Sequence, residues 1–263
     1  MRAITSNLAA VAPESGWGLP RDASVHGIRV DTLMYTTTVF VAIMFLATLV
    51  WIVLACWRHG RKHKADYDLG AARPQVIKAL VLSALVFGVV DGNLLVNGLL
   101  DLDQAFWNFE GAQAHPGAVR IQVNAHQWAW DARYAGPDGT FNTADDIVSL
   151  NDLRIPVGRP VIMQLASTDV IHSLSLPNFR VKQDAVPGMV TRMWFQAKDL
   201  GEFDIACAQH CGVHHYKMRG QLTVLSDADY EAWAAQASAL SQRSYDPQDK
   251  PAHWGWDWER GNK

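Results

Sequence analysis

The chain has 263 residues, of which 49% are hydrophobic and 19% charged, a composition that excludes an intrinsically disordered or low-complexity protein. The net charge of -3 at pH 7 leaves no surplus of basic residues for a nucleic-acid backbone, so we expect no nucleic-acid partner. Three cysteines are too few for a disulfide-stapled scaffold, and two of them, Cys207 and Cys211, stand close together among histidines.

Two long apolar segments lie in the N-terminal part of the chain. Residues 32–57 carry no charge and are long enough to cross a bilayer core of about 30 Å. The second segment, residues 76–100, is interrupted by Asp91, Asn93 and Asn97. The sequence therefore predicts a two-helix transmembrane hairpin. Two soluble core helices are the alternative, which the absence of a polar face in the first segment disfavours. That segment also starts too late and is too long for a signal peptide.

The connection between the two apolar segments is basic. Its cationic residues are Arg58, Arg61, Lys62, Lys64, Arg73 and Lys78. Because cytoplasmic loops carry an excess of Lys and Arg, we expect this loop in the cytoplasm and both ends of the hairpin on the outer side.

Asp91 in the second segment has two interpretations. A carboxyl inside a bilayer is unfavourable unless it pairs or reaches water, so Asp91 can mark a contact or a proton route toward a larger membrane subunit. Alternatively, the span ends early and Asp91 lies near the outer headgroups. Asn93 and Asn97, at helical spacing, suggest that protein rather than lipid covers one face.

From Ala118 onward the pattern changes to short alternating segments separated by Gly, Pro, Asn and Asp. Such segments predict an all-β sandwich or barrel. Ser226 with Asp229 three residues later resembles a capping box and predicts a terminal helix. Residues 136–146 are rich in Asp, but their spacing does not match an EF-hand loop, so a solvated hairpin is expected there rather than a calcium site.

The segment CAQHCGVHHYKM, from Cys207 to Met218, offers two thiols, three imidazoles and a thioether. Soft sulfur with imidazole selects copper or zinc, and a nearby Met favours copper. A disulfide between Cys207 and Cys211 would leave the His and Met residues unexplained, and structural zinc sites usually use CxxC knuckles rather than a three-residue spacer. A copper electron-transfer site uses every residue type present. Far upstream, His172 follows a strand-like segment and is placed to close the site from a neighbouring strand.

These residues resemble subunit II of the haem–copper cytochrome oxidases, the subunit that carries the binuclear copper A centre. The family motif Cys-x3-Cys-x3-His-x2-Met matches Cys207, Cys211, His215 and Met218, and the upstream family histidine matches His172. The segments HQWAWDARY, from residue 126, and VKQDAVPG, from residue 181, are similar to two further family segments. The resemblance covers about residues 30–240.

The resemblance implies a cupredoxin-like Greek-key barrel behind the transmembrane hairpin, with two coppers bridged by both thiolates. His172 and His215 would each bind one copper, and Met218 and the main-chain carbonyl of Gln209 would be weak axial ligands. His210 and His214 are extra imidazoles, and the family spacing favours His215 over His214 as the ligand.

Trp128 matches the tryptophan through which the family accepts electrons, and the alternative is a buried core tryptophan. Two departures from the family pattern stand out. Gln209 replaces a Glu whose carboxylate helps to bind magnesium between subunits I and II, so magnesium is doubtful here. Ala129 replaces an aromatic residue, although Trp130 remains.

The electron donor is expected to be a separate protein, because no CxxCH haem-attachment motif follows the β segments. Asp131, Asp169 and Asp184 are candidates for an acidic rim that steers a basic donor, with scattered solvated acids as the alternative.

The implied function is that of subunit II of a respiratory oxidase in the inner membrane, with two spans and a periplasmic copper domain. It would accept electrons from cytochrome c or a similar donor and pass them to haem in subunit I, where oxygen is reduced to water. The alternatives are the copper A subunit of a nitric oxide reductase of the same superfamily and a non-catalytic copper-binding membrane protein. A quinol-oxidase subunit II would lack the copper ligands.

The expected domain organisation has four parts. They are an outer N-terminal segment (1–31), the hairpin (32–100), the copper A domain (101–230) and a C-terminal helix with an extended tail (231–263).

Overall fold

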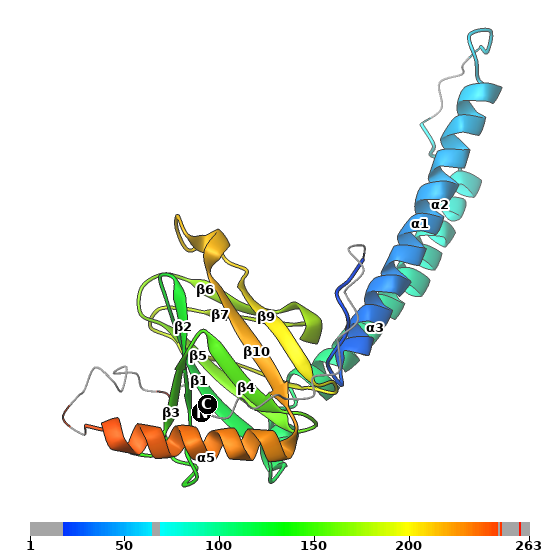
Figure 1. Cartoon of the computed structure of the whole chain (residues 1–263). Coiled ribbons are helices and arrows are strands. Elements are labelled where there is room, and N and C mark those ends of the chain that lie inside the picture. The colour runs from blue at the N-terminus through cyan, green and yellow to red at the C-terminus, as the bar shows by residue number, and fades with distance from the viewer. Residues whose placement is uncertain (1–17, 65–68, 247, 249–257, 259–263) are drawn as a thin grey trace. The chain divides into compact units, whose positions relative to one another are not determined.

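The computed structural model describes residues 18–64, 69–246, 248 and 258 of the chain (Figure 1). The chain divides into two compact units. Arg29–Ala105 forms a helical unit, and the described residues of Met1–Ile28 and Phe106–Lys263 form an outer unit. Most of the expected N-terminal segment and of the expected tail lies outside the described residues.

Two apolar helical segments make up the helical unit. The first is α1 (Gly27–Arg58). The second runs through α2 (Arg73–Val86), a π-helical turn η1 (Phe87–Asp91), α3 (Gly92–Asp101) and a second π-helical turn η2 (Leu102–Phe106), and the short α4 (Phe109–Ala114) follows. Both segments are long and apolar enough to cross a membrane. The predicted pair of candidate spans is confirmed.

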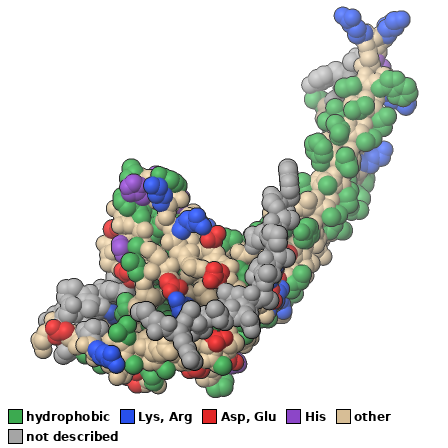
Figure 2. Space-filling model, viewed as in Figure 1, with side chains coloured by type: hydrophobic (Ala, Val, Ile, Leu, Met, Phe, Trp, Pro, Cys, Tyr) green, Lys and Arg blue, Asp and Glu red, His purple; other side chains and the backbone are tan. Residues whose placement is uncertain are grey.

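The surface of the helical unit matches a lipid environment. Large apolar side chains point outward along both segments, among them Trp51, Trp57 and Phe87, which are 72%, 82% and 71% exposed (Figure 2). In water such a continuous apolar surface would be unfavourable, whereas in a bilayer it contacts hydrocarbon. At the beginning of α1, the Arg29 guanidinium pairs with Asp101 at the end of α3, with 3.0 Å between Nη1 and Oδ1.

The described residues of the outer unit form ten strands in two sheets. The first sheet has the order β3-β2-β1-β5-β8 and the second β4-β10-β9-β6-β7. The strands are β1 (Val119–His126), β2 (Ala129–Tyr134), β3 (Ile147–Leu150), β4 (Asp152–Pro156), β5 (Pro160–Ser167), β6 (His172–Leu176), β7 (Val181–Ala185), β8 (Thr191–Gln196), β9 (Gly201–Cys207) and β10 (Arg219–Leu225).

The strand order requires the chain to cross repeatedly between the two sheets. β1 pairs in parallel with β5, and β4 in parallel with β10, whereas the other pairs are antiparallel. Inward-facing side chains of both sheets, such as Val123, Leu165, Leu174, Ile205 and Leu222, are fully or almost fully buried. Each contributes about 1.5–3 kcal/mol to folding by leaving water. The predicted cupredoxin-like, all-β Greek-key fold is confirmed.

Helix α5 (Asp227–Ser244) begins where the sequence predicts it. The Ser226 hydroxyl accepts a hydrogen bond from the Asp229 N–H at 3.2 Å, which satisfies one of the free donors of the first turn. The boundary expected after residue 230 therefore falls inside the first turns of this helix. The α5 residue Trp233 packs edge-to-face on Tyr134 of β2, with ring centroids 5.3 Å apart.

Loops gather at the end of the sandwich that lies away from α5 (Figure 1). The turn between β1 and β2 reaches the loop before β6, because the Gln127 N–H donates to the Asp169 carboxylate at 2.6 Å. The same turn reaches the β9–β10 loop, because the Gln127 side-chain amide donates to the Cys211 carbonyl at 2.8 Å. This end of the sandwich thus brings together segments that lie far apart in the sequence.

Candidate metal centre

Strand pairing brings the two ends of the Cys207–Met218 segment together. β9 ends at Cys207 and β10 begins directly after Met218, and the Cys207 N–H donates to the Met218 carbonyl at 3.2 Å. The residues between them form a loop that contains the short 3-10 helix η4 (His215–Lys217). The loop of residues 208–218, held at both ends by this strand pair, therefore presents several ligand-type side chains close to Cys207.

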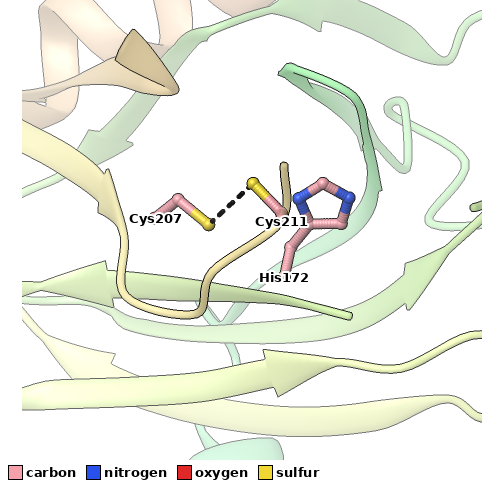
Figure 3. Close-up of side chains that lie close together, drawn as sticks. All are labelled: His172, Cys207 and Cys211. Atoms are coloured by element: carbon pink, nitrogen blue, oxygen red, sulfur yellow. Dashed lines mark hydrogen bonds between the residues drawn. The ribbon is translucent and has the colours of Figure 1, made fainter. Parts of the chain in front are cut away.

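His172 reaches the same place from another strand. β6 pairs antiparallel with β9, so that Leu174 lies opposite Cys207 and His172, two residues earlier, lies at the loop end. The His172 side chain is fully buried, and its Nδ1 lies 3.1 Å from the Met218 sulfur. Figure 3 shows the His172 ring directed toward the two thiols.

The sulfur atoms cluster closely. The Sγ atoms of Cys207 and Cys211 lie 3.7 Å apart, and both cysteines are free thiols. The Cys211 sulfur lies 3.6 Å from Nδ1 of His215 and 3.7 Å from Sδ of Met218. The Cys207 thiol lies 3.2 Å from the main-chain carbonyl oxygen of Gln209. All six groups that the family resemblance implies as ligands thus converge, and their assignment as ligands stays a prediction.

The two extra histidines point elsewhere. The His214 ring packs edge-to-face against the Trp128 indole, with centroids 4.5 Å apart. The His210 ring lies 5.6 Å from that of His215 and is exposed. The geometry therefore favours His215 over His214 as the ligand from this loop.

The two candidate tryptophans have different positions. Trp130 is fully buried, with its ring centroid 6.1 Å from that of His172. Trp128 is half-buried, and its indole N–H donates to the Cys211 carbonyl at 3.3 Å. Of the two, Trp128 alone combines partial exposure with a direct hydrogen bond to a ligand-type residue.

Gly212, directly after Cys211, is required by this arrangement. Its φ of +119° lies in a region that L side chains rarely adopt. A Cβ there would also lie 2.9 Å from the Gln127 side-chain nitrogen and 3.3 Å from the Trp128 ring. The glycine thus lets the cysteine loop approach the β1–β2 turn closely.

Asp169, one of the candidates for the docking rim, contacts a residue of the site. Its carboxylate lies 2.8 Å from Nε2 of His172 and accepts hydrogen bonds from the N–H groups of Gln127 and Val170, both at 2.6 Å. Burial raises the pKa of Asp169, but these hydrogen bonds outweigh it and hold the pKa below its usual value. An Asp three residues before a candidate ligand His was a signal in the sequence that we interpreted only as surface charge.

The other two acids expected in the rim are also constrained. Asp131 pairs with His126, with 3.2 Å between Oδ2 and Nε2. Asp184 is half-buried in β7. The acidic rim stays a prediction for all three acids, and Asp169 in addition contacts His172.

The donor set fits copper. Two thiols, two imidazole nitrogens and a thioether are soft or borderline ligands, which favour copper over hard cations such as magnesium. Burial raises the pKa of Cys211 to about 11, and the hydrogen bond and charge of Cys207 add to the effect. The free thiol is thus protonated near neutral pH, so metal binding here has to release a proton.

Comparisons with known proteins agree with this geometry. Residues 119–224, which include the whole candidate site, match the model of the family "Cytochrome C oxidase subunit II, periplasmic domain". This part of the chain is therefore similar to the periplasmic domain of cytochrome c oxidase subunit II. A relative that matches beyond that domain is the cytochrome c oxidase subunit 2 of Cereibacter sphaeroides, 26% identical over 253 residues, which cover 84% of this chain and 80% of that protein.

Other relatives of the family match more closely over a shorter span. The alternative cytochrome c oxidase subunit 2 of Bradyrhizobium diazoefficiens is 38% identical over 146 residues, which cover 47% of this chain and 53% of that protein. The subunit 2 of Thermostichus vulcanus is 38% identical over 133 residues, which cover 51% of this chain and 38% of that protein. The chain thus spans about half or less of these two relatives.

A solved structure of the family is also similar to the chain. The crystal structure of the periplasmic domain of subunit II of cytochrome oxidase from Bradyrhizobium japonicum is 28% identical to it, with a TM-score of 0.42. The match covers 46% of this chain and 94% of that domain.

Proposed function

We propose that this chain is the electron-accepting subunit II of a respiratory haem–copper oxidase and holds a binuclear copper A centre. The observation that carries the proposal is the convergence of Cys207, Cys211, His172, His215 and Met218 at one end of the β-sandwich. The two apolar helices and the basic connection between them support a location in the inner membrane, with the copper domain in the periplasm.

The residues present support specific roles in this centre. The copper pair would be held by the thiolates of Cys207 and Cys211 and by Nδ1 of His172 and of His215, together with the Met218 sulfur and the Gln209 carbonyl. When bound, the copper pair supplies a one-electron redox couple. The strands that carry these residues hold them in place, and Asp169 fixes the His172 ring by its bond to Nε2. Gln209 offers no carboxylate, so we assign no magnesium to its side chain.

The position of Trp128 supports its proposed role in electron acceptance. Its ring is half-exposed, and one hydrogen bond joins it to the Cys211 carbonyl. A cytochrome c or similar protein that docks over Trp128 would contact an aromatic edge directly connected to the cysteine loop. Further subunits, including the one that carries haem and reduces oxygen to water, would receive the electrons.

The first test is metal content. The full chain, purified in detergent and loaded with copper, should hold two coppers and show a mixed-valence signal shared over both metals. Cys207→Ser and Cys211→Ser should each abolish that signal, because each removes a bridging thiolate. A colourless wild-type chain that holds one zinc would contradict the assignment of a binuclear copper centre.

The second test separates the two neighbouring histidines. His215→Ala should destroy the mixed-valence spectrum, because Nδ1 of His215 lies 3.6 Å from the Cys211 sulfur. His214→Ala is the matched control and should leave the spectrum nearly intact, because its ring packs on Trp128. The reverse result would show that the ligand assignment in this loop is wrong.

The third test concerns electron acceptance. Trp128→Ala should slow stopped-flow reduction of the site by a soluble cytochrome c, with little change in donor affinity. Trp107→Ala, at a 66% exposed tryptophan outside the site loops, is the control and should leave the rate unchanged. An unchanged rate in Trp128→Ala would place electron acceptance elsewhere. Turnover with oxygen or nitric oxide by the assembled complex distinguishes the two types of reductase.

A further inference from the structure

We propose that Asp91 is a docking point, within the membrane, for a helix of the haem-bearing subunit that presents a cationic or hydrogen-bond-donating side chain. The inference rests on the proposed membership of an oxidase complex. It concerns a residue of the helical unit, outside the metal centre, to which the proposed function assigns no role.

The depth of Asp91 follows from the ion pair at the outer end of the hairpin. Arg29 and Asp101 form an ion pair, with 3.0 Å between Nη1 and Oδ1, at the beginning of α1 and the end of α3. We take this ion pair to mark the outer surface of the membrane. Asp91 lies ten residues before Asp101, a helical rise of about 15 Å. On the other side, Lys78 lies thirteen residues earlier, or about 20 Å away.

A bilayer core is about 30 Å thick, so these distances put Asp91 near its middle. The alternative, in which the span ends early and Asp91 lies among headgroups, does not fit the residues that follow. Leu94, Leu95, Val96, Leu99 and Leu100 continue the apolar helix toward Asp101. The carboxyl therefore needs a partner within the membrane.

The other polar groups nearby have partners. Asp101 has Arg29, and the Asn97 amide donates to the main-chain carbonyl and the side-chain oxygen of Asn93, at 2.9 and 3.2 Å. The Asp91 side chain is exposed, and no described residue of the helical unit donates a hydrogen bond to it. An unpaired carboxyl in hydrocarbon is strongly unfavourable, whereas a donor or cation from a neighbouring helix removes that penalty.

The backbone around Asp91 leaves room for such a helix. The π-helical turn η1 ends at Asp91, and glycines stand at positions 88 and 92. A Cβ placed on Gly88 would meet nothing within 4 Å, so the space beside this turn is open. Small residues let a neighbouring helix approach closely. A second copy of the chain would bring a second Asp91 carboxylate to the same place, so a donor-bearing partner fits the charge better.

The experiment uses the complex purified through a tag on this chain. Haem recovered per copper should fall about tenfold in Asp91→Leu, because the partner's donor is then left unsatisfied within the membrane. Asp91→Asn should retain more haem than Asp91→Leu, because the amide oxygen still accepts a hydrogen bond. Asn97→Leu is the matched control on the same helix and should retain the wild-type amount. A photo-crosslinking residue at position 91 should capture the haem-bearing subunit.

The copper signal of the outer domain distinguishes a loss of docking in the membrane from damage to the copper domain. It should be unchanged in every variant, because Asp91 lies outside the domain that holds the copper. Wild-type haem recovery in Asp91→Leu, or crosslinks only to lipid or to a second copy of the chain, would overturn the inference. Absence of haem from the wild-type complex would count against the proposed function instead.

Discussion

Two loops of the outer domain carry several metal-ligand side chains, and the structure uses them in opposite ways. The β9–β10 loop holds thiols, imidazoles and a thioether, and the β2–β3 loop, residues 136–146, holds three aspartates. In the first loop the potential ligand atoms point toward one another, with sulfur–sulfur and sulfur–nitrogen distances of 3.6 to 3.7 Å.

In the β2–β3 loop the carboxylates are already occupied by hydrogen-bond donors of the same loop. Asp138 accepts from the Thr140 N–H at 2.7 Å, and Asp145 accepts from the Thr143 hydroxyl at 2.7 Å. Asp146 accepts from the Asn142 N–H at 2.7 Å and, from β2, pairs with the buried Arg133 at 3.5 Å. These hydrogen bonds and the ion pair hold the β2–β3 loop together, and the absence of a calcium site there stays a prediction.

Ligand-type residues can form a metal site only when their donor atoms are not already paired within the protein. Substitutions in the cysteine loop should therefore affect metal binding more than folding. Substitutions in the aspartate loop should affect folding and leave the metal centre intact.

Arg133→Ala should cause the largest loss of stability, about 3–5 kcal/mol, because it leaves the buried Asp146 carboxylate without its cation. Chemical denaturation of the copper-loaded chain measures the loss, and the copper spectrum of the folded protein should stay as in the wild type. Arg219→Ala removes an exposed pair with Asp204 and should change stability by no more than about 1 kcal/mol. Equal effects of the two substitutions would contradict the structural role of the buried pair.

Asp169→Asn should weaken copper binding about 10- to 100-fold, because the carboxylate that orients the His172 ring is lost. Competition with a copper chelator measures the affinity. Asp184→Asn is the control, an acid on neighbouring β7 whose side chain does not reach His172, and should leave the affinity unchanged. If both variants bind copper equally well, Asp169 does not position the ligand.

Gly212→Ala should destabilise the copper-loaded chain by about 1–3 kcal/mol, the cost of a strained backbone, and also displace Trp128. Gly139→Ala in the aspartate loop is the matched control, because its φ is +67° but a Cβ there meets nothing within 4 Å. Both variants should lose stability in thermal unfolding, but only Gly212→Ala should slow reduction by cytochrome c. If both variants were reduced more slowly, backbone strain in either loop would be sufficient to slow electron acceptance, and the contact between Gly212 and Trp128 would not be the cause.

Asp138→Asn should have the smallest effect. Its carboxylate accepts a hydrogen bond from the Thr140 N–H in an exposed loop, so the free energy of unfolding should change by less than about 0.5 kcal/mol. Added calcium should leave the melting temperature of the wild type and of this variant unchanged. A rise with calcium that the substitution abolishes would show that the loop binds the cation after all.

Elements that depend on local patterns were predictable from the amino-acid sequence. Long, largely apolar segments predicted both candidate spans, alternation and turn residues predicted the β domain, and Ser226 predicted the beginning of α5. The spacing of Cys207, Cys211, His215 and Met218 pointed to the family, because one loop carries all four residues.

Features that depend on strand register and on the direction of side chains became visible only in the folded protein. The β6–β9 pairing brings His172 to a loop more than thirty residues away, and the β1–β2 turn brings Trp128 to Cys211 while Trp130 turns into the core. Asp169 looked like surface charge until its contact with His172 was visible. Local patterns specify each element, but a one-residue shift in register would send these side chains to the opposite face, so long-range packing fixes the site.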